Sequence, residues 1–252
     1  MPVPAPPSRI ADATAARAGL TARIVPAATI GAELRGRMFA LFDRYYDAID
    51  PARFAADLSG KDTAILLEHG VELAGFTTLR SFGFDWRGER IEVLFSGDTI
   101  VDRAFWGEQV LARAWLAEAG RIARARPGRR LFWFLIVKGH RTWRYLPAFA
   151  RQWVPHPAGD EPADWRALRD AIATDLFGAD FDPTSGLIRF AASRGHLAAD
   201  WAEPAPREAG LTQVAWFRAA NPGHAHGDEL ACLCELSHAN MRARARRWFD
   251  GG

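Results

Sequence analysis

The chain has 252 residues, of which 49% are hydrophobic and 25% are charged, so it is long enough to bury a core and too apolar to be disordered. The net charge is only +2, and the one dense basic cluster spans Arg242 to Arg247, which argues against a nucleic-acid partner. The two cysteines, Cys232 and Cys234, are one residue apart, so no disulfide framework and a reducing compartment are expected.

The first twenty residues are rich in proline and alanine and are expected to form a flexible tail. They contain no basic stretch followed by an apolar run, so no signal peptide is expected. The strongest apolar run, Leu131–Val137, is too short to cross a bilayer. These features predict a cytoplasmic protein without a membrane partner.

The segment after the tail alternates helix and strand patterns. Thr21–Val25 predicts a short strand, and apolar residues at helical spacing predict a helix over Gly31–Tyr46. A second helix is expected at Pro51–Leu58, with Asp50 as its N-cap. Turn signals at 69–70 and 85–89 then separate three expected antiparallel strands: Thr63–Glu68, Glu72–Ser81, and Arg90–Phe95 continuing into Asp98–Val101.

A long helix and a buried strand follow. Trp106–Arg126 has an apolar stripe at helical spacing and ends at Pro127-Gly128. Leu131–Val137 is continuously apolar, as in a strand that is covered on both faces. A helix from about His140, interrupted at Pro147, and a strand near Gln152–Val154 complete this part.

A proline-rich stretch, Pro155–Pro162, reads as a linker. It predicts one domain over residues 21–157 and a C-terminal extension over 158–252 that packs on or caps the core. In the extension, Asp164–Phe177 predicts a helix, whereas Leu187–Phe190 and Val214–Phe217 predict short strands. Leu230–Leu236 fits either a strand or a helix.

Polar residues interrupt the apolar pattern at the first of two strand exits. In Ser96-Gly97-Asp98-Thr99, glycine inside a strand pattern indicates a bulge or a close backbone approach, and a plain turn fits the pattern equally well. Asp98 is a candidate base for an amine substrate, and Glu92 is a lesser one.

The second strand exit is Lys138-Gly139-His140-Arg141, directly after the buried strand. The carboxyl ends of strands in open α/β sheets face the ligand crevice. His140 is therefore either a base or a cap of the following helix, and Lys138 and Arg141 are candidates to bind an anion. A hydrolase triad of Ser96, Asp98 and His140 is disfavoured because the Gly-x-Ser-x-Gly elbow is missing.

Metal-capable side chains lie within a short span of the extension: His224, His226, Asp228, Glu229, Cys232 and Cys234. Their spacing matches no zinc pattern, and buried cysteines are ordinarily small apolar residues. We therefore expect no metal ion.

The order of elements over residues 21–154 resembles that of the GCN5-related N-acetyltransferase (GNAT) superfamily. The resemblance implies an α/β fold with a mixed, largely antiparallel sheet flanked by helices, here with a C-terminal α/β extension. It also implies that an acyl-thioester co-substrate, acyl-CoA or acetyl-CoA, lies in the V between Ile91–Val101 and Leu131–Val137.

The family's pyrophosphate loop reads Arg/Gln-x-x-Gly-x-Gly/Ala, and this chain matches it poorly. Gly107 stands at the first glycine, but Ala104 and Gln109 occupy the other two key positions, so the loop is degenerate. Tyr145 resembles the family's tyrosine that protonates the departing thiolate. The resemblance implies that the co-substrate is bound by seven residues: Ile100, Val101, Arg103, Gly107, Gln109, Lys138 and Arg141.

Two functions follow as hypotheses. The first is a GNAT-like N-acyltransferase that moves an acyl group from a thioester donor to a small amine, with Tyr145 as acid and Asp98 or His140 as base. The alternative is a catalytically degenerate GNAT-fold module that binds a ligand or a protein. That module would use aromatic residues as its contact surface: Phe82, Phe84, Trp86, Phe105, Trp106, Trp143 and Trp153. A homodimer stays open for either hypothesis.

Overall fold

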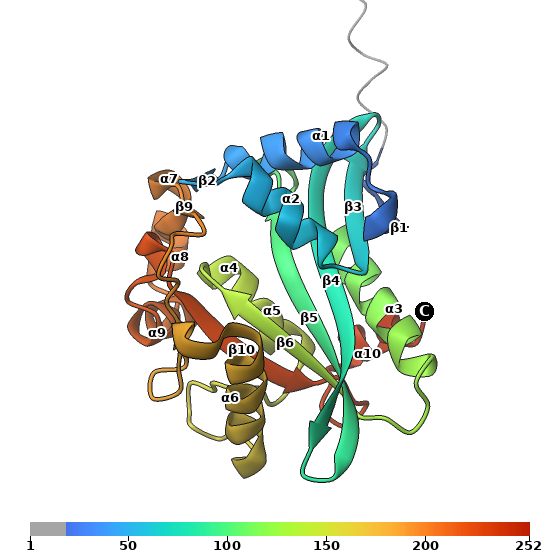
Figure 1. The fold of residues 1–252 in the computed structure, drawn as a ribbon, viewed down its shortest axis with the longest axis vertical. Helices are drawn as coiled ribbons and strands as arrows, with labels where there is room; N and C mark the ends of the chain where they lie inside the picture. Colours follow the sequence, from blue (N-terminus) through green and yellow to red (C-terminus); the bar gives the residue numbers. More distant parts are fainter. Residues whose placement is uncertain (1–18) are drawn as a thin grey trace, which may run out of the picture.

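A computed structural model describes residues 19–252, so the expected N-terminal tail lies almost entirely outside the described residues. The centre of the described part is an eight-stranded sheet with the strand order β1-β3-β4-β5-β6-β10-β8-β7 (Figure 1). All neighbouring strands pair antiparallel except β5 and β6, which are parallel. The strands are β1 (Thr21–Pro26), β3 (Thr63–His69), β4 (Glu72–Trp86), β5 (Glu89–Val101), β6 (Leu131–Val137), β7 (Phe181–Asp182), β8 (Leu187–Ile188) and β10 (Glu229–Glu235).

The mixed, largely antiparallel sheet predicted from the sequence is confirmed. A separate two-stranded ladder joins β2 (Tyr46–Asp47) to β9 (His196–Leu197). The helices are α1 (Ala32–Asp43), α2 (Pro51–Ser59), α3 (Val110–Arg124), α4 (His140–Trp143), α5 (Tyr145–Phe149), α6 (Ala163–Phe177), α7 (Ala199–Ala202), α8 (Pro206–Ala209), α9 (Thr212–Ala220) and α10 (Ala243–Phe249). None of the helices in residues 19–252 is long and apolar enough to cross a membrane.

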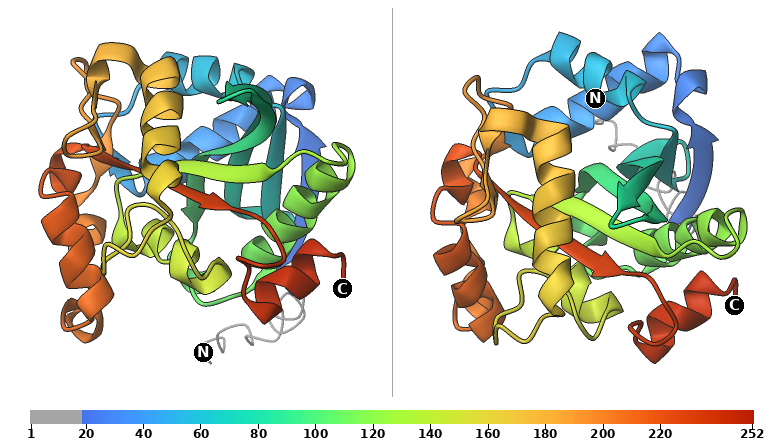
Figure 2. Two further views of the ribbon diagram at one scale, coloured as in Figure 1. Left: turned by 90° about the horizontal axis from the view of Figure 1, so that it is seen from below. Right: turned by 60° about the horizontal axis from the view of Figure 1, so that its bottom comes forward.

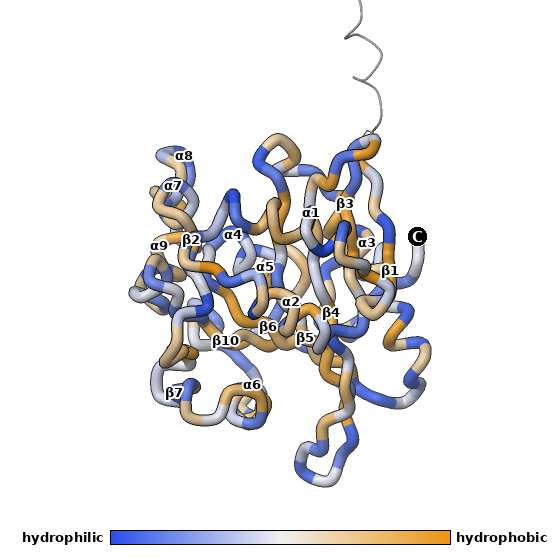
Figure 3. Tube along the Cα trace, turned by 45° about the horizontal axis from the view of Figure 1, so that its top comes forward, coloured by the Kyte–Doolittle hydropathy of each residue, from blue (hydrophilic) through white to orange (hydrophobic). Residues whose placement is uncertain are grey.

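Alternation along β3 separates two hydrophobic clusters, one on each face of the sheet. Ala64 and Leu66 point into a cluster with α1 and α2, whereas Ile65 and Leu67 point into a larger cluster with α3. Successive side chains of a strand project to opposite faces, so one four-residue run serves both layers. Figures 1 and 2 show α1 and α2 on one side of β3–β5 with α3 and α10 on the other, and Figure 3 shows the hydrophobic residues gathered along the strands.

Local signals explain several element boundaries. The Asp50 side chain accepts hydrogen bonds from the N–H groups of Ala52 (2.6 Å) and Arg53 (3.0 Å), so the expected N-cap of α2 is confirmed. The long helix begins later than expected, at Val110, because Arg103–Phe105 forms a separate 3₁₀ turn before it.

The C-terminal extension differs most from the expectation. Val214 and Phe217 lie in α9 and not in a strand, and both are fully buried. Their spacing of three places them on one helix face, and a short apolar run does not distinguish strand from helix. The ambiguous segment 230–236 is β10, which pairs with β6 over Leu230–Glu235. The strand expected at 152–154 is reduced to a single bridge from Val154 to Leu233.

Strands β7, β8 and β10 therefore continue the same sheet as β1 and β3–β6. Residues on both sides of the expected linker share one hydrophobic cluster, which includes Phe134 from β6 and Leu233 from β10. The extension is an integral part of the sheet, and residues 193–208 also reach back to the exits of β5 and β6.

Candidate active site

The two parallel strands β5 and β6 separate in the middle of the sheet. They pair from Glu92 opposite Leu131 to Ser96 opposite Leu135, and no pairing between them continues beyond. Strand β5 runs on to Val101, while β6 ends at Val137. A V-shaped gap therefore opens between the two strand exits, as the resemblance implied.

A β-bulge marks the point where the gap begins. Thr77 pairs with Thr99 and Leu79 with Ser96, so one residue of β4 faces Gly97 and Asp98 together. The polar interruption is thus a bulge within one continuous strand, not a turn. Bulges redirect side chains and often lie beside active sites.

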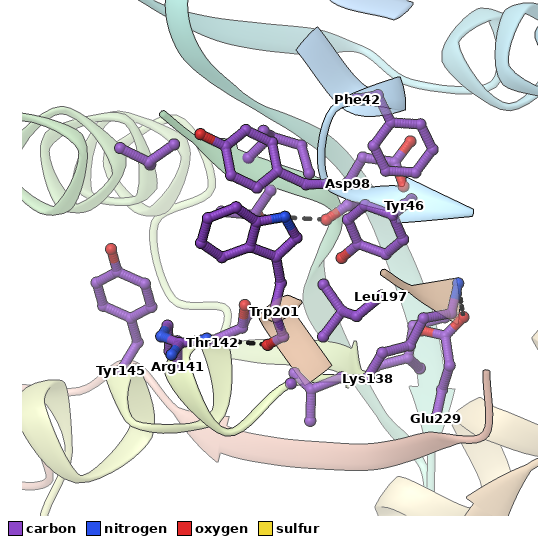
Figure 4. Close-up of a pocket in the computed structure, with 18 of the residues that line it drawn as sticks. Phe42, Tyr46, Asp98, Lys138, Arg141, Thr142, Tyr145, Leu197, Trp201 and Glu229 are labelled. Carbon is purple, nitrogen blue, oxygen red and sulfur yellow. Dashed lines mark hydrogen bonds and ion pairs between the residues drawn. The ribbon is translucent and has the colours of Figure 1, made fainter. Parts of the chain in front are cut away.

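A cavity of about 590 Å³ fills the gap. Its walls come from β5, β6, the α1–α2 connection, α4, α5 and residues 193–208 of the extension. Figure 4 shows side chains from these distant segments around one space. The labelled side chains include Tyr46, Asp98, Lys138, Tyr145, Trp201 and Glu229.

Asp98 lies among charged groups on this wall. We define the Asp98 cluster as Asp57, Lys61, Asp98, Lys138 and Glu229. Lys61 pairs with Asp57, and Lys138 pairs with Glu229 at 3.2 Å. The carboxylate of Asp98 forms no ion pair or hydrogen bond with any residue from 19 to 252. Burial, followed by the nearby Asp57 carboxylate, raises the pKa of Asp98 to about 6, against the opposing effect of Lys61 and Lys138.

Lys61 is held directly against the bulge. A Cβ atom at Gly97 would lie 2.5 Å from Lys61 Cε and 2.5 Å from Thr78 Oγ1, so only glycine leaves room for the lysine. The ammonium group lies 5.6 Å from the centre of the Phe95 ring. The bulge glycine therefore fixes both the backbone and the position of a buried cation.

Tyr145 stands on α5 at the opposite wall of the cavity, on the same side as Arg141 and Thr142 (Figure 4). Its ring packs against Phe149, and burial raises the pKa of its phenol. A smaller cavity of about 30 Å³ also borders Tyr145 and reaches Ser96, whose hydroxyl accepts from the indoles of Trp115 and Trp133 at 3.1 and 2.9 Å. A neutral phenol therefore borders both cavities.

The outer part of the cavity is crowded by aromatic side chains. The indole N–H of Trp106 donates to the Val101 carbonyl at 2.8 Å, and the Arg141 guanidinium lies 4.4 Å from the centre of the Trp106 ring. Trp201 from α7 packs edge-on against Trp106 and contacts Tyr45. Arg141 also donates to the Trp201 carbonyl at 3.0 Å, which ties the extension to the β6 exit.

Seven of the ten residues singled out in the sequence line this cavity: Asp98, Ile100, Val101, Gly107, Lys138, Arg141 and Tyr145. The other three are His140, Arg103 and Gln109. His140 is buried with its Nε2 3.4 Å from Glu208, and burial, then Arg141, lowers its pKa. Arg103 lies over the Trp201 ring, and Gln109 is the exposed N-cap residue of α3. The geometry thus favours Asp98 over His140 as a base.

Sequence reasoning missed Tyr46, Lys61, Glu229 and Trp201, which also line the cavity. Tyr46 lies beside Asp98 and Glu229, and burial strongly raises the pKa of its phenol. A signal existed for the lysine, because Lys61 and Lys138 are the only lysines of the chain. No comparable pattern in the sequence placed Glu229 or Trp201 at this cavity. Both belong to the C-terminal extension.

The metal-capable residues of the extension are separated. Cys232 and Cys234 are buried in β10, where burial raises the pKa of both thiols, and His224 Nδ1 is bonded to the Asn221 carbonyl. Within residues 19–252 no three histidine, cysteine, aspartate or glutamate side chains are grouped as metal ligands.

The cavity wall suits the extended arm of an acyl thioester better than it suits the pyrophosphate at the donor's other end. Beyond Ser96 the β5 edge lacks a strand partner in β6, so this edge could pair with an extended arm, although the Val101 carbonyl already accepts the Trp106 indole N–H. At the other end, Gly107 adopts a φ of 101° before α3, but Glu108 adds a negative charge where a pyrophosphate would lie. The degenerate loop is therefore also unfavourable in its electrostatics.

No family model matches the sequence, and no curated protein matches it. Similar solved structures are distant. A conserved protein of Enterococcus faecalis V583, described as a probable N-acyltransferase, is 18% identical over 50% of this chain and 31% of its own, with a TM-score of 0.37. Arabidopsis thaliana NAA60 in complex with acetyl-CoA is 15% identical over 53% and 87% of the two chains, with a TM-score of 0.37. The GNAT family N-acetyltransferase YhbS from Escherichia coli in complex with CoA is 18% identical over 52% and 69%, with a TM-score of 0.36.

These similarities cover about half of this chain, and the chain spans only about a third of the E. faecalis protein. The resemblance to the GNAT fold rests on the topology of the chain itself, namely the strand order β1-β3-β4-β5-β6, the bulge in β5 and the V between β5 and β6.

Proposed function

We propose that the chain is an N-acyltransferase that transfers an acyl group from a thioester donor, acyl-CoA or an acyl carrier, to a small amine. One observation carries the proposal. The separation of β5 and β6 at the bulge creates a cavity with a partner-free carboxylate, Asp98, on one wall and a half-buried phenol, Tyr145, on the other.

The two groups have the protonation states that the reaction needs. Asp98, with a pKa of about 6, is ionised at neutral pH and accepts the proton of the amine. A bound thioester supplies the acyl carbon, to which the amine nitrogen bonds as the carbon–sulfur bond breaks. Tyr145 stays protonated because burial raises its pKa, and it donates its proton to the leaving sulfur.

Backbone and side-chain groups around the V would hold the donor. The β5 segment from Ile100 to Val101 would offer backbone groups to the donor's arm. Lys138 and Arg141 also border the cavity, but an anionic group of the donor would have to compete there with Glu229 and Glu208, with which they are paired. The free N–H groups at the start of α3 favour an anion, whereas the Glu108 carboxylate just before the helix opposes one. Trp106 already donates to the Val101 carbonyl, so donor binding at this position requires the indole to move.

The test is donor binding combined with turnover of Tyr145→Phe. We expect acetyl-CoA to bind in isothermal titration calorimetry, and the variant to lose about 100-fold or more in kcat while its donor affinity and melting temperature change little. Absence of binding for every acyl-CoA and acyl carrier tried would contradict the donor half of the proposal. Equal kcat for the variant would contradict the role of Tyr145.

The second candidate is a ligand-binding module without turnover. Two features favour it. The pyrophosphate loop departs from the family's pattern, and the Val101 carbonyl already accepts a hydrogen bond from the Trp106 indole. Of the aromatic residues expected for such a module, Phe105 and Trp106 border the cavity, whereas Trp143 and Trp153 are buried in the core. Ligand binding without any acyl transfer in the wild-type chain would decide for this candidate.

A further inference from the structure

The distribution of lysine in this chain is uneven. Thirty of its 32 basic residues are arginine, and the two lysines, Lys61 and Lys138, both border the same cavity. They come from different parts of the chain, one after α2 and the other after β6. Every other Lys or Arg position of the chain is arginine, which indicates that these two positions require the more compact ammonium group of lysine.

Both lysines are already neutralised. Lys61 contacts the Asp57 carboxylate and donates to the Asp57 carbonyl at 3.3 Å. Lys138 pairs with Glu229 and donates to the Arg194 carbonyl at 3.2 Å. Their side chains are 4% and 11% exposed, so little of either is free for another anion.

Two pairs of opposite charge leave Asp98 as the uncompensated member of the Asp98 cluster. Two arginines that border the cavity, Arg53 and Arg194, are held by uncharged groups and keep their positive charge, but neither forms an ion pair with Asp98. Arg53 donates to the carbonyls of Ala192 and Ser193, and the Arg194 guanidinium lies 3.7 Å from the centre of the Phe190 ring. The cluster thus carries one net negative charge when its groups are ionised, and this charge faces the cavity.

Aromatic rings share the cavity wall with this charge. Phe42, Tyr46, Phe54 and Phe95 border the cavity, and the Lys138 ammonium lies 5.7 Å from the centre of the Tyr46 ring. The ladder between β2 and β9 spans this side and joins the α1–α2 connection to the extension. A ligand beside Asp98 therefore meets apolar ring surfaces and has limited space.

We infer that the acceptor is a primary amine on a compact aromatic or apolar body without an anionic group, and that Asp98 binds its ammonium between the Lys61–Asp57 and Lys138–Glu229 pairs. The inference rests on the proposed transfer only in naming this ligand the acceptor. Lys61 and Lys138 are each paired with another carboxylate, so neither neutralises the charge of Asp98. The two pairs therefore act as positioning groups beside it. An ammonium beside Asp98 brings the net charge of the cluster to zero, whereas a carboxylate on the ligand would add a second uncompensated negative charge.

The experiment compares ligands that share one ring and differ in charge. The wild-type chain is titrated with 2-phenylethylamine, L-phenylalanine and 3-phenylpropanoate by calorimetry, with and without saturating coenzyme A. We expect 2-phenylethylamine to bind and the two carboxylates to bind at least about tenfold more weakly. Tighter binding of either carboxylate, or no binding of the amine under both conditions, would overturn the inference.

A matched pair of variants assigns the effect to Asp98. Asp98→Asn removes the charge at nearly constant volume and is expected to weaken binding of 2-phenylethylamine about tenfold or more. Asp175→Asn makes the same change on the exposed surface of α6 and is expected to have no effect. Equal loss in both variants, or no loss in Asp98→Asn, would contradict the assignment.

The pH dependence adds a readout that a structural role would not give. Asp57, Lys61, Lys138, Glu229 and Tyr46 are the charged and titratable groups around Asp98. Amine binding should weaken about tenfold from pH 7.5 to pH 5 in the wild type and stay flat in Asp98→Asn. Amine binding without donor binding would leave the ammonium site at Asp98 intact and refute acyl transfer. Donor binding without amine binding would overturn the ammonium site and leave acyl transfer intact.

Discussion

Asp98 is a carboxylate kept in an environment that disfavours its charge. It is partly buried, it lies near Asp57 and Glu229, and it has no partner at ion-pair distance among residues 19–252. Such a group reduces folding stability when it is ionised, and active sites commonly retain this kind of cost because function requires it. Tyr145 differs from Asp98 in this respect, because burial raises the pKa of its phenol and the neutral form carries no such cost.

The stability of Asp98→Asn tests this trade-off. The folded state binds the Asp98 proton more tightly than the unfolded state, because the pKa is raised from 3.8 to about 6. The destabilising effect is therefore absent well below pH 4, grows between pH 4 and 6 and is complete above pH 6. We expect the variant to be more stable than the wild type at pH 7.5 in urea unfolding. Its advantage should shrink by roughly 1–2 kcal/mol at pH 4.5. An advantage independent of pH would refute the explanation.

Strand β5 places the site through its bulge. The extra residue at Gly97 and Asp98 ends the pairing with β6 and turns the carboxylate toward the cavity. Helix α2, capped by Asp50, brings Asp57 to the same wall, and Lys61 follows directly after it. Strand β5, helix α2 and the connection that carries Lys61 thus come together at Gly97.

Gly97→Ala is expected to destabilise the chain by about 1–3 kcal/mol, because the added methyl group overlaps Lys61 and Thr78. Amine binding should fall as well, since Lys61 has to move. Gly36→Ala is the control. It lies in the middle of α1 with nothing within 4 Å of the new atom, so it should stabilise by about 0.5–1 kcal/mol. Both values come from chemical denaturation, and similar effects of the two changes would contradict the packing at the bulge.

At the scale of the whole molecule, the sheet is completed from the far end of the sequence. Strand β10 lies between β6 and β8, and its residues from Glu229 to Cys234 are buried. Residues 193–208 and Glu229 also supply part of the cavity wall. Stability and site therefore both depend on the extension.

A chain truncated after Pro157 tests this dependence. Without β10, the apolar strand β6 becomes an exposed edge and loses its pairing over Phe132–Val137. We expect the truncated chain to lack a cooperative thermal transition and near-ultraviolet circular dichroism, in contrast to the full chain. A cooperative transition in the fragment would show instead that the linker at 155–162 separates independent domains.

The sequence by itself determined the local elements and much of one wall. The apolar runs of β3 and β6 and the capping residue Asp50 are local patterns, and each corresponds to the structure. The polar residues after β5 and β6 marked the site because strand ends face the crevice between them. Seven of ten named residues accordingly line the cavity.

Only the tertiary structure decided which distant residues join them. Glu229 and Trp201 reach the cavity because β10 pairs with β6 and β9 pairs with β2, and such pairings leave no periodic signal in either segment. His140 was named from its position in the chain, yet it faces Glu208 instead of the cavity, since the direction of a side chain depends on the packing of its helix. The sequence therefore located the two strand exits. The tertiary structure added the charged and aromatic side chains, such as Glu229 and Trp201, that line the cavity between them.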